Sequence, residues 1–123
     1  MVALLTPSGK LGDRVAELCA GRPLAAPHLL PFEVANVLRR HEVGGRLDPT
    51  AARLAHQDLL DLHVELWPFR AVASRVRALQ ANVTAYDASY VAVAESLDAP
   101  LVTLDERLAR APGPRCSFAL VTG

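Results

Sequence analysis

The fold is decided between residues 84 and 105, which read TAYDASYVAVAESLDAPLVTLD. Thr84 can cap a helix that runs through Tyr90 to Leu97, with apolar residues at helical spacing. Residues 100–104 follow as a short apolar run, which is typical of a buried strand. A helix that leads directly into a buried strand predicts an α/β domain whose sheet is largely parallel.

The same alternation of helices and strands continues on both sides of this stretch. The sequence predicts helices over residues 10–20, 29–43, 49–62, 71–80 and 106–110, and strands over 23–27, 64–67 and 118–121. Asp48 and Pro49 are typical of a helix start, as N-cap and first helical residue. We therefore expect residues 1–123 to form a single three-layer α/β domain, a mostly parallel sheet flanked by helices.

Composition limits the class of protein. The chain has 123 residues, 51% hydrophobic and 21% charged, which suits one globular domain. Thirteen basic and thirteen acidic residues cancel, so any contact with nucleic acid must come from a local patch. No apolar run has the length of a membrane span, and Met1 opens no secretion signal. Two cysteines favour a reducing, cytoplasmic location, although a Cys19–Cys116 disulfide remains an alternative.

Three acidic residues stand out from the polar surface. Glu33 has apolar neighbours at helical spacing, although it could also favour the helix dipole and lean into solvent. Asp87 shares a helix face with residues expected to pack on the sheet, but Thr84-x-x-Asp87 also resembles a capping box. Asp105 directly follows a strand, where open α/β sheets place their ligands, and it can also cap the next helix.

All three residues are expected at the same edge of the sheet, since helix starts and strand ends gather there. Carboxylates drawn together repel unless a cation neutralises them. An all-oxygen site suits a hard divalent ion such as Mg²⁺ or Mn²⁺. Such an ion lowers the pKa of bound water and stabilises charge on a phosphodiester. The pattern therefore indicates metal-assisted phosphodiester hydrolysis.

Three segments, in matching order and spacing, resemble the PIN-domain VapC toxins. Residues 27–38 (PHLLPFEVANVL) are similar to the family segment that bears a conserved glutamate. Residues 84–95 (TAYDASYVAVAE) resemble the family's YDAxYxALAE helix, and residues 101–108 (LVTLDERL) resemble its LxTxDxxL segment. The resemblance implies that Glu33, Asp87 and Asp105 are three of four acidic residues around a Mg²⁺ or Mn²⁺ ion, with the Thr103 hydroxyl behind them.

One departure from the family pattern concerns the start of the chain. The family opens with a strand that ends in an aspartate, within a pattern like VVDASALVALL, and residues 1–5 match only the end of that pattern. We therefore expect the first strand and its aspartate to be missing, and the domain to be N-terminally truncated relative to the family. Met1 would then be an internal methionine, or the protein a truncated relic. An in-frame stop codon directly upstream would rule out that Met1 is an internal methionine.

The resemblance implies the toxin component of a type II toxin–antitoxin system. Such a protein is a Mg²⁺- or Mn²⁺-dependent endoribonuclease that cleaves structured RNA, often transfer RNA, forms a homodimer and is silenced by a VapB-type antitoxin. The alternative is a catalytically impaired PIN-fold protein that retains dimerisation and antitoxin binding.

Other sequence features do not favour a different enzyme class. The histidines lack zinc-ligand spacing with either cysteine, and neither a G-x-S-x-G elbow nor a Walker loop is present. Arg39, Arg40 and Arg46 either contact an RNA backbone or form a solvated helix end. Trp67 and Phe69 are expected in the core.

Overall fold

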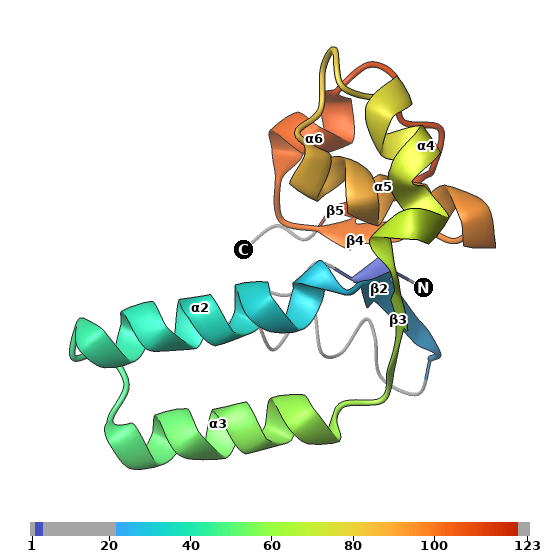
Figure 1. Ribbon diagram of the computed structural model, residues 1–123. Helices are drawn as coiled ribbons and strands as arrows, with labels where there is room; N and C mark the ends of the chain where they lie inside the picture. Colours follow the sequence, from blue (N-terminus) through green and yellow to red (C-terminus); the bar gives the residue numbers. More distant parts are fainter. Residues whose placement is uncertain (1, 4–21, 121–123) are drawn as a thin grey trace.

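The computed structural model describes residues 2–3 and 22–120, and its sheet is parallel, as predicted (Figure 1). Five strands pair in the order β3-β2-β1-β4-β5, and all neighbouring strands are parallel. The strands are β1 (Val2–Ala3), β2 (Leu24–Pro27), β3 (Val64–Trp67), β4 (Leu101–Thr103) and β5 (Phe118–Leu120). Strand order reverses direction at β1, because β2 and β3 lie on one side of it and β4 and β5 on the other.

The centre of the sheet corrects one expectation from the sequence. A missing first strand was expected, yet β1 fills the central position: Val2 pairs with Ala25 of β2 and with Leu101 of β4. The physical reason is that β2 and β4 would otherwise leave backbone N–H and C=O groups unpaired inside the domain. This strand has only two residues, and neither is acidic, so it adds no carboxylate to the site.

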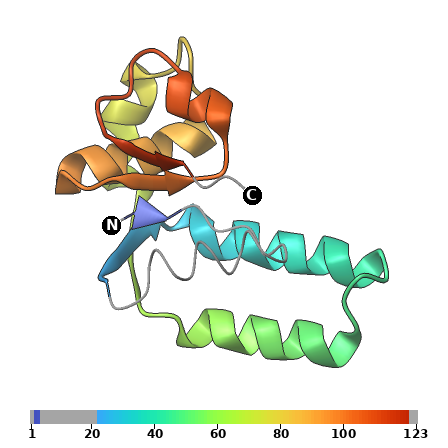
Figure 2. The same cartoon turned by 180° about the vertical axis from the view of Figure 1, so that it is seen from behind.

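The helices agree closely with the sequence-based expectation. They are α2 (Leu29–Val43), α3 (Pro49–Asp61), α4 (Phe69–Ala78), α5 (Ala85–Leu97) and α6 (Glu106–Arg110). The helix predicted over residues 10–20 lies outside the described residues. Both ribbon views place α4, α5 and α6 on one side of the sheet (Figures 1 and 2). On the other side, α2 and α3 lie side by side and extend away from the sheet, which gives the three-layer arrangement.

Helix α4 begins two residues before the predicted start because Pro68 is its N-cap residue and Phe69 its first residue. The first turn gives no amphipathic signal, since Phe69 points outward with 67% of its surface exposed. The expectation that Phe69 belongs to the core is therefore wrong. Trp67, in contrast, packs against the core cluster, as expected.

Helix α5 is the centre of the core. Every residue from 88 to 94 is buried, because α5 lies between α4 and strands β1, β2 and β4. A helix that is apolar on all sides is stable only when it is enclosed in this way. Tyr90, Val91 and Val93 are at most 1% exposed, as is Leu101 on β4 beneath them. The position of α5 relative to the sheet is therefore fixed tightly, along with the carboxylate in its first turn.

An ion pair joins α4 to the last turns of α5. Arg75 Nε lies 2.6 Å from Glu95 Oε1, and the backbone N–H of Arg115 donates to Glu95 Oε2 at 2.6 Å. Arg75 also donates to the carbonyl of Gly113 at 3.0 Å, which ties down the loop before β5. Cys116, in the same loop, is a free and half-buried cysteine. None of the described helices is long and apolar enough to cross a membrane.

Candidate functional site

Asp105 directly follows β4 and caps α6. Its Oδ1 accepts hydrogen bonds from the backbone N–H groups of Arg107 at 2.9 Å and Leu108 at 3.2 Å. The turn before it is held by Thr103, whose fully buried Oγ1 accepts the Asp105 backbone N–H at 3.0 Å. The Thr103 hydroxyl therefore fixes the turn that presents Asp105, and the predicted N-cap is confirmed.

Asp87 lies in the first turn of α5, beside the N-cap Thr84. The Thr84 hydroxyl oxygen accepts the Asp87 backbone N–H at 3.1 Å, so half of the expected capping box is present. Burial raises the pKa of the Asp87 carboxyl above its ordinary range, the charge of Asp105 adds to the rise, and a hydrogen bond with the Thr84 side chain opposes it. The capping role does not remove the cost of a half-buried charge that faces a second carboxylate.

Asp87 and Asp105 share one pocket. It is open, has a lining that mixes polar and apolar side chains and a volume of about 320 Å³, and is lined by Asn82, Val83, Thr84, Asp87, Asp105, Arg107, Leu108 and Ala111. The pocket lies where β4 ends and α5 begins, next to the central strand at which the strand order reverses. Such a switch point in an open parallel sheet is the usual place for a ligand.

Glu33 does not line this pocket but is linked to it through Tyr90. The buried Tyr90 hydroxyl donates to Glu33 Oε1 at 2.5 Å, which joins α2 to α5. Burial raises the pKa of Tyr90 strongly, and the negative charges of Glu33 and Asp87 raise it further. The phenol therefore lies in the field of both carboxylates and keeps its proton. The alternative of a helix-dipole carboxylate fails for Glu33, because no acidic residue lies in the first turn of α2.

The three predicted site residues are thus brought to one region in two parts: Asp87 with Asp105, and Glu33 behind Tyr90. Within residues 2–3 and 22–120 no group of three or more His, Cys, Asp or Glu side chains is close enough to hold a metal ion. The pair in the pocket still fits Mg²⁺, which is commonly bound through one or two carboxylates together with water and substrate phosphates. Their mutual repulsion is the feature that a cation would relieve.

Two functional candidates were missed in the sequence. Tyr90 was assigned only to packing, although its spacing of three residues from Asp87 on one helix face signalled that their side chains are neighbours. Arg107 was overlooked because a helix with the sequence ERLAR gives no sign that one arginine faces the pocket. Arg39 and Arg40, which the sequence offered for RNA contacts, lie exposed in the second half of α2.

Comparison with known proteins gives consistent matches. A family model described as PIN domain matches residues 2–114. Ribonuclease VapC9 of Mycobacterium tuberculosis is 39% identical over 105 residues, which cover 85% of this chain and 83% of the relative. Ribonuclease VapC1 of the same organism is 43% identical over 97 residues, 78% of this chain and 73% of the relative. The crystal structure of PAE2754 from Pyrobaculum aerophilum superposes with a TM-score of 0.59 at 26% identity, covering 86% of this chain and 71% of that one.

Proposed function

The chain belongs to the PIN domain family, and from this premise we propose that it is a divalent-metal-dependent endoribonuclease, the toxin component of a type II toxin–antitoxin system. The relatives named VapC ribonucleases support RNA as the substrate, and we extend this to structured RNA such as transfer RNA. The observation that carries the proposal is the presence of Asp87 and Asp105 in one pocket at the switch point of the sheet.

The residues of the pocket have separate tasks in this proposal. Asp105 is held rigidly, because two backbone N–H groups fix its Oδ1, and it lines the pocket together with Asp87. Asp87 supplies the opposing carboxylate, and Arg107 supplies a positive group on the pocket wall for a phosphate of the RNA backbone. Mg²⁺ or Mn²⁺, bound between the carboxylates, would activate water and stabilise negative charge on the phosphodiester.

Glu33 completes the acidic set as we propose it. Tyr90 keeps its proton at any working pH, so it always donates to Glu33 and holds that carboxylate in one orientation. The orientation matters because Glu33 belongs to α2 and Asp87 to α5, so the Tyr90 hydrogen bond is what ties the Glu33 carboxylate to the helix that carries Asp87. A carboxylate fixed in this way can accept a proton from an attacking water without first reorganising.

The proposal includes protein partners and a location. We propose that the protein acts in the cytoplasm as a homodimer and is silenced by a VapB-type antitoxin; the VapC names of the relatives support the antitoxin partner. Helix α3 leaves apolar surface for such contacts: Leu54 is 57% exposed and Leu60 is 68% exposed. Co-expression with the protein encoded beside this gene, followed by light scattering of the complex, tests this part.

The test of the enzyme is cleavage of bulk transfer RNA by chelator-treated protein to which Mg²⁺ or Mn²⁺ is returned. We expect cleavage only with the metal, and loss of cleavage in Asp87→Asn. Asp48→Asn is the matched control, since Asp48 also caps a helix but lies on the exposed start of α3. Metal-independent cleavage, or full activity in Asp87→Asn, would contradict the proposal.

A second function, a PIN-fold protein that binds partners without cutting RNA, is favoured by one observation. Strand β1 contributes no carboxylate, and Glu33 stands outside the pocket that holds Asp87 and Asp105. Fewer ligands weaken metal binding. In the same assay this alternative predicts no cleavage at any metal concentration, while dimerisation and antitoxin binding persist.

A further inference from the structure

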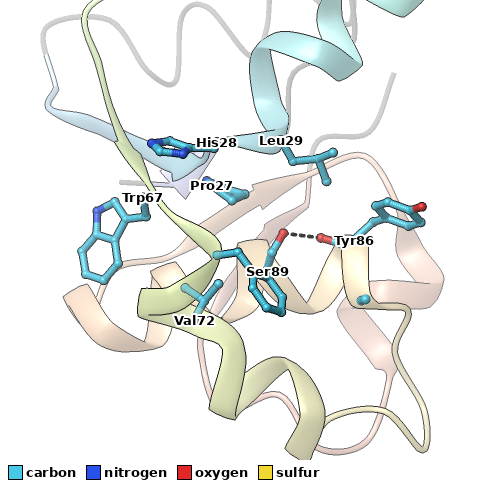
Figure 3. A pocket seen from close by; sticks show the side chains of 9 residues that line it. Pro27, His28, Leu29, Trp67, Val72, Tyr86 and Ser89 are labelled. Atoms are coloured by element: carbon cyan, nitrogen blue, oxygen red, sulfur yellow. Dashed lines mark hydrogen bonds between the residues drawn. The ribbon is translucent and has the colours of Figure 1, made fainter.

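A second pocket lies on the other side of the first turn of α5 and is almost wholly apolar. Its volume is about 240 Å³, and it is bounded by the ends of β2 and β3 and the starts of α2, α4 and α5. Figure 3 shows Trp67 and Tyr86 on opposite sides, with Ser89 and Val72 between them. The Ser89 hydroxyl is already used, because it donates to the Tyr86 carbonyl at 2.6 Å.

Aromatic residues are concentrated at this pocket. Trp67, Phe69 and Tyr86 line it, half of the aromatic residues in a chain that has one Trp, two Tyr and three Phe. Two of them are held open to solvent: Phe69 is 67% exposed and Tyr86 is 66% exposed. Large aromatic side chains left in water beside an apolar hollow lose the stabilisation that burial would provide. They are therefore suited to a ligand with flat apolar faces.

The pocket neighbours the carboxylate site, because both take residues from the first turn of α5. Tyr86 directly precedes Asp87, and Leu29, on the pocket wall, lies one helical turn before Glu33. The apolar pocket takes residues 85, 86 and 89 of α5, whereas the acidic pocket takes Thr84 and Asp87. The two pockets therefore lie on neighbouring faces of the first turn of α5, so that one RNA strand can reach both.

We propose that the apolar pocket binds one base of the RNA strand whose backbone crosses the carboxylates, a subsite that rests on the proposed ribonuclease function. A single base fits the size of the pocket, and its faces match the exposed rings of Phe69 and Tyr86. Phosphates are excluded, since the lining contains neither lysine nor arginine. Recognition is by stacking and is tolerant of sequence, with purines favoured over pyrimidines because they stack over a larger area.

Trp67 provides a direct probe of this pocket because it is the only tryptophan in the chain. Its fluorescence is followed while chelator-treated protein is titrated with a single-stranded oligoadenylate, or with an abasic oligomer of equal length and charge. We expect a saturable change with the oligoadenylate and none with the abasic oligomer. Equal changes with both would overturn the proposal, as would a change that follows protein concentration without RNA and so assigns the pocket to a second copy of the chain.

Substitution of the exposed aromatic residues of the pocket provides a second test. Tyr86→Ala and Phe69→Ala should each weaken oligoadenylate binding by about tenfold, since stacking on one aromatic ring is worth roughly 5- to 150-fold per base. Both side chains are exposed, so folding is preserved. Val43→Ala, a truncation at a position 77% exposed at the far end of α2, is the matched control and should bind as the wild type does. Unchanged binding in both aromatic variants would overturn the proposal.

The outcome is separable from that of the proposed ribonuclease function, because binding is measured without metal and without cleavage. In the cleavage assay Tyr86→Ala should raise KM about tenfold and leave kcat nearly unchanged, as expected for lost binding at a distance from the reacting bond. RNA cleavage without a base-dependent change in fluorescence would contradict the base-pocket proposal and leave the ribonuclease function in place. A base-dependent change in fluorescence without RNA cleavage would contradict the ribonuclease function and leave the base-pocket proposal in place.

Discussion

Replacement of Asp105 separates its structural role from its proposed catalytic role. Its Oδ1 accepts two backbone N–H groups, from Arg107 at 2.9 Å and Leu108 at 3.2 Å. Asp105→Asn keeps an oxygen at this position, so both hydrogen bonds can persist. Asp105→Ala removes them, and α6 has only five residues to compensate. Because loss of an N-cap costs about 0.5–2 kcal/mol, we expect the alanine variant to lose about 1–2 kcal/mol of unfolding free energy.

Urea unfolding followed by circular dichroism measures the structural effect, and cleavage of transfer RNA measures the functional one. The asparagine variant should stay within about 0.5 kcal/mol of the wild type, since its cap is kept and one repulsive charge is removed. Both variants should lose at least roughly 100-fold in cleavage rate, because even partners that only orient a metal ligand contribute about 10- to 100-fold.

Asp48→Ala is the matched control for this experiment. Asp48 caps α3 in the same manner, with Oδ1 accepting the Ala51 N–H at 2.9 Å, but it lies away from the pocket. It should lose similar stability and no cleavage activity. If Asp105→Asn cleaves RNA as fast as the wild type, Asp105 is only a helix cap and the assignment of the site is refuted.

Three further predictions concern the network around the site. Burial would raise the pKa of Glu95, but Arg75 and the backbone N–H of Arg115 lower it overall. The stability that Glu95 contributes is therefore present above its ordinary pKa of 4.5 and is lost as pH falls through the lowered value. Glu95→Gln should reduce this loss of stability at acid pH, as measured by urea unfolding over a range of pH. Tyr90→Phe should cost about 0.5–1.5 kcal/mol in the same measurement and slow RNA cleavage, because Glu33 loses the donor that orients it. The pKa of Asp87 is raised, so its effect on stability runs the other way: in chelator, the free energy of unfolding falls as pH rises from 3.8 through the raised pKa. Asp87→Asn should therefore melt at a higher temperature than the wild type at neutral pH. An equal or lower melting temperature would contradict the repulsion between Asp87 and Asp105.

Most of the fold was accessible from local signals. Asp48-Pro49 marked the start of α3, and Thr84 marked the start of α5, because caps satisfy backbone groups within a few residues. The start of α4 was missed, since Phe69 is exposed and gives no amphipathic pattern. Strand β1 was missed for a different reason: two residues carry no periodicity, and their pairing depends on β2 and β4, which are distant in sequence.

The site was accessible only in part. The topology of a parallel sheet was enough to bring Asp87 and Asp105 to one edge, and the structure places them in one pocket. The hydrogen bond between Tyr90 and Glu33 was not accessible, because the two residues are 57 positions apart and only the packing of α2 against the sheet brings them together. The apolar pocket was hidden for the same reason, as its walls come from five separate elements.

Binding of Mn²⁺ to chelator-treated protein, measured by calorimetry in the absence of RNA, tests the central claim most directly. A divalent-cation site formed by Asp87 and Asp105 predicts saturable binding in the wild type and in Asp48→Asn, and its loss in both Asp87→Asn and Asp105→Asn. Identical Mn²⁺ binding by all four proteins, or none in the wild type, would show that these carboxylates do not form a metal site.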